Sequence, residues 1–112
     1  MDSNTNKNEL LPTREQLEQL RIMTNENDHS GARLFAAKIL SNLWLERNAR
    51  DAYANPFLPL VAAMAQVVRQ HQSLGHAPAS LAGARFALWG VAYSLAEDNG
   101  LGAAARALRE AL

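Results

Sequence analysis

The sequence contains no cysteine, so its 112 residues can form no disulfide, no cysteine-ligated zinc site and no thiolate nucleophile. It also lacks an excess of either charge, because eleven basic and eleven acidic residues cancel. This balance argues against the broad basic surface that nucleic-acid-binding proteins use. It also leaves little charge repulsion to oppose self-association.

Targeting segments and long apolar runs are missing as well. Residues 1–9 are polar and lack the basic-then-apolar order of a signal peptide. The longest apolar stretch, residues 81–96, is about 16 residues long and contains Arg85, so it is too short and too charged for a membrane span. We therefore expect a soluble, cytoplasmic protein that does not enter a membrane.

The residues that usually carry chemistry show no catalytic or ligand-binding spacing. No serine lies in a Gly-x-Ser-x-Gly elbow, and the histidines at positions 29, 71 and 76 do not share the face of one helix as a zinc site requires. Residues 25–28 lack the glycine and the terminal glutamate of a calcium loop. We predict no catalytic residue, no metal, no cofactor and no enzymatic activity.

Apolar residues recur at helical spacing through most of the chain, and no segment shows the alternation of a strand. The pattern predicts helices from residue 13 to about 24, from 28 or 30 to 47, from 56 to about 73, from 80 to 98 and from 101 to 112. We expect an all-α fold, a compact bundle of about five helices of the αα-hairpin type. Residues 1–11 are predicted to form a disordered polar tail, and residues 12–112 a single domain.

Several helix ends have specific local signals. Thr13 with Gln16 three residues later matches a capping box, and Ser80 is placed to cap the fourth helix. Asn55 followed by Pro56 predicts the start of the third helix, after a loop over residues 48–55. Gly100 is expected to end the fourth helix in the left-handed conformation that glycine adopts readily.

Residues 81–96 are apolar on nearly every side, so this helix must be covered on nearly every side. It is therefore either the central helix of the fold, or it keeps one face for another chain. On a helical wheel it has an aliphatic face, an aromatic face of Phe86, Trp89 and Tyr93, and a small face of Gly83, Ala87, Gly90 and Ser94. We expect a helix of the same domain to cross the small face, with contact to another subunit as the alternative. The aromatic face is either core or an interface anchor.

Three further residues have two interpretations each. Arg85 either reaches solvent or stacks on Trp89, with pairing to a carboxylate as the alternative. Leu34 and Leu45 lie opposite the apolar face of the second helix, where they are either singly exposed residues or a second contact surface. The triplet Gly-Ala-Arg occurs at residues 31–33 and at 83–85, near the starts of two helices, but it is too short to predict a duplication.

These features predict a small helical protein that acts through protein–protein interaction, as a homo-oligomer (a homodimer is expected), an adaptor, a chaperone-like protein or an inhibitory subunit. The predicted interface residues are Phe86, Trp89, Tyr93, Gly83, Gly90, Arg85, Leu34 and Leu45. The alternative is a nucleic-acid-associated transcriptional regulator that uses Arg33, Lys38, Arg47 and Arg50. A small-ligand carrier or an enzyme is the third possibility and would need a cavity.

Overall fold

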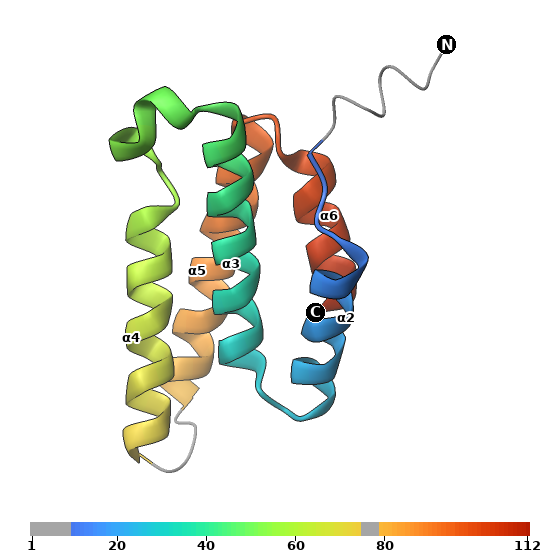
Figure 1. The fold of residues 1–112 in the computed structure, drawn as a ribbon. Coiled ribbons are helices and arrows are strands. Elements are labelled where there is room, and N and C mark those ends of the chain that lie inside the picture. The colour runs from blue at the N-terminus through green and yellow to red at the C-terminus, as the bar shows by residue number, and fades with distance from the viewer. Residues whose placement is uncertain (1–9, 75–78) are drawn as a thin grey trace.

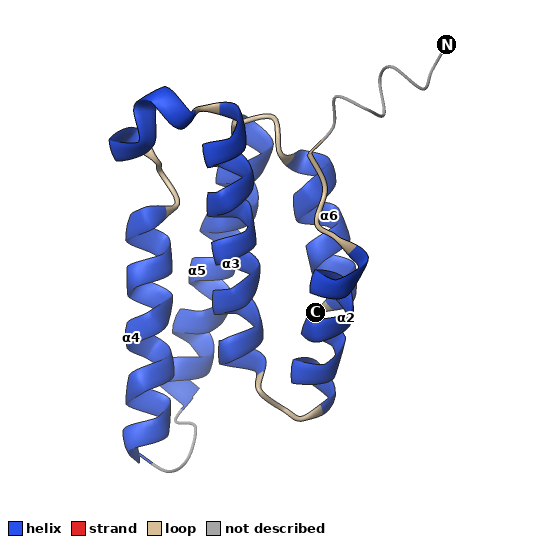
Figure 2. Ribbon diagram, in the orientation of Figure 1, coloured by secondary structure: helices blue, strands red, loops and turns tan. Residues whose placement is uncertain are grey.

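The computed structural model describes residues 10–74 and 79–112, and every regular element in these residues is a helix. The elements are α2 (Arg14–Asn25), α3 (His29–Arg47), the 3-10 helix η1 (Ala49–Ala54), α4 (Leu58–Leu74), α5 (Ala79–Asp98) and α6 (Gly102–Ala111). Consecutive α-helices run antiparallel to each other (Figure 1, Figure 2). The predicted all-α bundle is confirmed, and η1 forms where a loop was expected. Of the predicted tail, only Leu10 and Leu11 lie within the described residues.

The α-helices form two layers, with α4, α3 and α2 in one layer and α5 and α6 in the other (Figure 1). The helix at the centre is α3, which contacts each of the other five elements. Small residues on several sides of α3, including Ala32, Ala36 and Ala37, let its neighbours approach closely, and all three are buried. The possibility that residues 81–96 form the central helix is therefore wrong.

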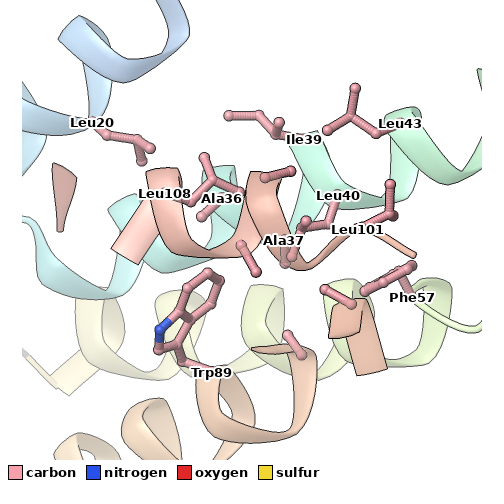
Figure 3. Close-up of a cluster of buried hydrophobic side chains, with 14 of the residues drawn as sticks. Leu20, Ala36, Ala37, Ile39, Leu40, Leu43, Phe57, Trp89, Leu101 and Leu108 are labelled. Carbon is pink, nitrogen blue, oxygen red and sulfur yellow. The ribbon is translucent and has the colours of Figure 1, made fainter. Parts of the chain in front are cut away.

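The core lies where α3 meets the other helices. Its largest fully buried side chains come from α2, α3 and α6, from the residue before α6 and from the turn before α4: Leu20, Ile39, Leu40, Leu108, Leu101 and Phe57. Trp89 is the large core side chain of α5, beside the small Ala92 and Ala96, and its indole points into this cluster (Figure 3). Each such side chain stabilises the fold by about 1.5–3 kcal/mol relative to an exposed one.

The turn before α4 differs from the sequence prediction. α4 begins at Leu58 rather than at residue 56, which places Phe57 in the core. The buried side chain of Asn55 fixes this turn, because its Nδ2 donates to Ser41 Oγ at 2.8 Å and its Oδ1 accepts from the Phe57 amide at 3.0 Å. These bonds join the turn to α3, so the Asn55 signal marks a tertiary contact as well as a helix start.

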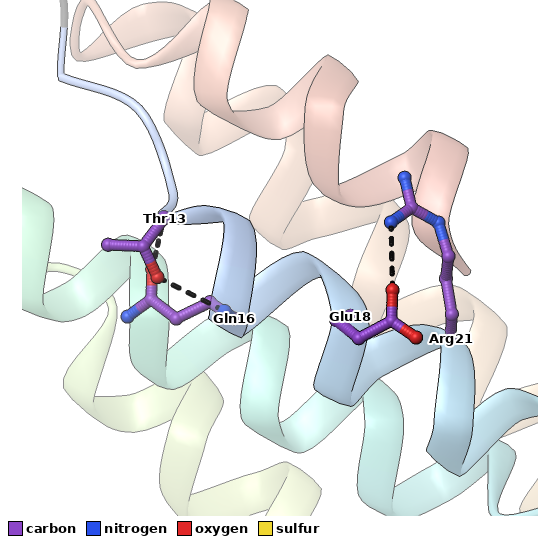
Figure 4. Close-up of polar contacts among 4 residues, drawn as sticks. All are labelled: Thr13, Gln16, Glu18 and Arg21. Atoms are coloured by element: carbon purple, nitrogen blue, oxygen red, sulfur yellow. Dashed lines mark hydrogen bonds and ion pairs between the residues drawn. The ribbon is translucent and has the colours of Figure 1, made fainter.

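Two of the predicted helix ends are confirmed in detail. Thr13 and Gln16 form the reciprocal bonds of a capping box at the start of α2, as Figure 4 shows beside the exposed Glu18–Arg21 ion pair. Gly100 has φ +75°, the left-handed conformation expected after α5. The predicted cap at Ser80 is wrong, since α5 already begins at Ala79 and Ser80 lies inside it. Residues 75–78, which join the third and fourth predicted helices, lie outside the described residues.

Candidate functional site

The site is built on α5, whose three predicted faces meet different surroundings. Trp89, Ala92 and Ala96 are buried against the rest of the domain. The aliphatic side, with Leu88 and Leu95, is half-buried against the core. α5 contacts α3, α4 and α6, and these neighbours leave one side of it open along its length.

The open side of α5 is the small face. Gly83, Ala87, Gly90 and Ser94 are all exposed, and a Cβ atom added at either glycine would have no heavy atom within 4 Å. Among the described residues no helix therefore crosses this face, and the expectation that one does is wrong. The glycines are not explained by close packing within the domain, although each costs about 1 kcal/mol relative to alanine inside a helix.

Two large apolar side chains border the small face. Phe86 on one side is 56% exposed and Val91 on the other is 53% exposed. We call the surface of Gly83, Phe86, Ala87, Gly90, Val91 and Ser94 the α5 face. Its C-terminal part continues into a shallow groove of about 460 Å³ that Leu95 and Asp98 also line. The other large exposed apolar residues of the described chain, such as Leu11, Tyr53 and Leu74, lie on different elements. Neighbouring exposed apolar residues of this kind indicate an interaction surface more strongly than single ones do.

The predicted aromatic face is divided by the fold. Trp89 is 8% exposed and belongs to the core, so its prediction as an interface anchor needs correction: no partner can reach it while the domain is folded. Tyr93 is half-buried, with its ring edge-on to Trp89 at 6.3 Å and Arg109 stacked on it at 4.9 Å. Of the three aromatic residues, Phe86 alone is exposed enough to serve as an anchor.

Beside Phe86, two arginines from different helices meet. The Cζ atoms of Arg33 on α3 and Arg85 on α5 lie 4.8 Å and 5.2 Å from the centroid of the Phe86 ring. Arg85 also donates to Ser30 Oγ at 3.3 Å. The predicted stacking of Arg85 on Trp89 is therefore replaced by stacking on Phe86. Burial, and then the positive charge of Arg85, lowers the pKa of Arg33 from its ordinary value.

Leu34 and Leu45 do not form an exposed surface. Both are half-buried and pack against the core, because α3 has neighbours on several sides. Of the residues proposed for nucleic-acid contact, Arg33 and Arg47 make contacts within the domain, whereas Lys38 and Arg50 are exposed. Arg33 stacks on Phe86, whereas Arg47, at the other end of α3, donates to the Gly100 carbonyl at 3.2 Å. The second contact surface predicted at Leu34 and Leu45 is thus largely occupied by the protein itself.

Within residues 10–74 and 79–112, no three histidine or acidic side chains are grouped so that they could hold a metal ion. The same part of the chain has no helix that combines the length and apolar character needed to cross a membrane. His29 and His71 are half-buried, and position 76 lies outside the described residues. The α5 face and the arginine pair beside it are therefore the features from which a function is inferred.

Comparison of the chain with protein-family models, with curated proteins and with solved structures finds no match.

Proposed function

We propose that this protein acts through protein–protein interaction, and that the α5 face binds a second copy of the same chain. The observation that carries the proposal is the exposure of the small face, at Gly83 and Gly90 above all, on a helix that has no charged side chain between positions 85 and 97. Glycine permits another backbone to approach closely, and an uncharged face can meet its own copy without repulsion.

The α5 face is also complementary to itself. In a twofold-symmetric dimer the same patch of both subunits is buried. If two antiparallel copies of α5 cross at Gly90, residues equally far from it in opposite directions lie opposite each other. The exposed Phe86 ring of one protomer then meets the partner's Ser94, four residues to the other side of the crossing. A large apolar side chain is thereby matched with a small one.

Phe86 is the predicted anchor of this dimer. Its ring leaves water on association, and burial of an aromatic side chain of this size is typical of the few residues that dominate binding energy. Val91 adds apolar area on the other border of the face. Trp89 supports the interface from beneath, because its place in the core fixes the position of α5.

The test is the oligomeric state in solution, measured by sedimentation equilibrium over a wide range of protein concentrations. We expect the wild-type protein to form a dimer and the Gly90→Glu variant to be monomeric, because two carboxylates would meet at the crossing. Gly90 has open space around it, so the variant retains its fold. Ala62→Glu places the same charge on the exposed side of α4 and is expected to leave the dimer intact.

Two results contradict the proposal. The first is a wild-type protein that stays monomeric at every concentration. The second is a dimer that Gly90→Glu and Ala62→Glu weaken equally, which would place the interface elsewhere. Circular dichroism of both variants shows whether each is folded, so loss of the dimer is not confused with loss of the domain.

A further inference from the structure

A second feature, beside the α5 face, is the pair of arginines on Phe86. Arg33 and Arg85 come from positions far apart in the chain, yet both guanidinium groups lie over the ring of Phe86. Within the described residues no ion pair joins either of them to a carboxylate. Two positive charges thus share one small region without a compensating negative charge.

The inner edges of both guanidinium groups have no hydrogen-bond acceptor. Nε of Arg33 and Nε of Arg85 are buried and donate to no atom of the described chain. They border a crevice that Met64, Val67 and Leu88 also line, and it has no room for a water molecule. Buried donors without a partner are unfavourable, and charged ones more so.

The outer edges of the two groups are only partly occupied. Arg33 Nη1 donates to the His29 carbonyl and Arg85 Nη1 donates to Ser30 Oγ, both at 3.3 Å. Neither Nη2 atom has an acceptor in the described residues, and both side chains are half-exposed. Donors therefore remain available at the surface beside an exposed aromatic ring.

We propose that Arg33 and Arg85 form a binding site for a single oxyanion group, either a phosphate or a carboxylate, next to Phe86. Guanidinium groups bind such groups through paired hydrogen bonds. A doubly charged phosphate would compensate both positive charges, and a carboxylate would compensate one of them. This site does not depend on dimer formation, because both arginines belong to the same chain.

The test compares thermal unfolding in sodium phosphate, sodium acetate and sodium chloride at equal ionic strength. We expect phosphate or acetate to raise the melting temperature of the wild-type protein above its value in chloride. Arg33→Met and Arg85→Met each remove one cation, and we expect them to lose this increment. Arg69→Met, which removes an exposed arginine of α4 whose side chain contacts Gln66, keeps it and controls for general salt effects.

A larger rise in melting temperature with phosphate than with acetate indicates a phosphorylated ligand. A rise with acetate that equals or exceeds the rise with phosphate indicates a carboxylate. The proposal is overturned if the wild-type protein, both pair variants and Arg69→Met respond equally to the anions. Repeating the comparison in the Gly90→Glu background separates this site from dimerisation. The increment persists in that background if the site is independent, and it disappears there if the anion acts only through the dimer.

Discussion

Replacing the two exposed glycines of α5 with alanine should stabilise the isolated domain. Gly83 and Gly90 lie inside a 20-residue helix, and an added Cβ at either position meets nothing within 4 Å. The change therefore gains the helix propensity of alanine, about 1 kcal/mol for each site, with no steric cost. The double variant Gly83→Ala/Gly90→Ala should gain about 1–2 kcal/mol in free energy of unfolding.

The assay is urea unfolding at a protein concentration low enough to keep the chain monomeric. We expect a higher urea midpoint with an unchanged m-value. In thermal unfolding we expect the melting temperature to rise by roughly 5–15 °C, because 1 kcal/mol corresponds to about 4–8 °C in a domain close to this size. Gly100→Ala is the matched control with the opposite sign. Its φ of +75° and the nearby Arg47 Nη1 make any Cβ there unfavourable.

A double variant that is less stable than the wild-type protein would refute the reasoning, because it would mean that another part of the domain covers the face. The same substitution has a different effect on the proposed dimer. At Gly90 the two added methyl groups would meet at the crossing and hold the helices apart. Gly90→Ala is thus expected to stabilise the monomer while it weakens the dimer.

Three further substitutions test other parts of the structure. Trp89→Ala should destabilise the domain by about 3–5 kcal/mol in urea unfolding, because it leaves a cavity in the core. Phe86→Ala should change the stability of the monomer by less than about 1 kcal/mol and still weaken the dimer in sedimentation. A larger loss of stability from Phe86→Ala than from Trp89→Ala would contradict the assignment of Trp89 to the core and Phe86 to the surface. Thr13→Ala removes the capping box of α2 and should cost about 1 kcal/mol in urea unfolding, so an unchanged midpoint would mean that the cap contributes nothing.

The features that the sequence predicted correctly depend on neighbouring residues. The bond between Thr13 and Gln16 spans three positions, and Gly100 has its special conformation because of the turn in which it lies. The helices themselves follow from the spacing of apolar residues and from polar or glycine-containing breaks between them. For these features the chain provides both the cause and the structure within a few residues.

The features that were missed depend on packing between distant segments. Hydropathy indicated residues 81–96 as a possible central helix. The central helix is α3 instead, because its small residues let several neighbours pack around it. Helical spacing grouped Trp89 with Phe86, and only the positions of the neighbouring helices show that one is buried and the other exposed. The Arg33–Arg85 pair had a faint signal in the repeated Gly-Ala-Arg triplet, but nothing in the sequence placed both arginines over one ring.

The most direct test of the proposed dimer uses the absence of cysteine from the chain. A single Gly90→Cys substitution puts one thiol at the proposed crossing, where two copies of residue 90 face each other. A disulfide forms only when the two Cα atoms come within about 7 Å. Under mild oxidation, we expect Gly90→Cys to form a covalent dimer much faster than Ala62→Cys, which is exposed on α4. Equal rates for the two variants would contradict the assignment of the α5 face as the dimer interface.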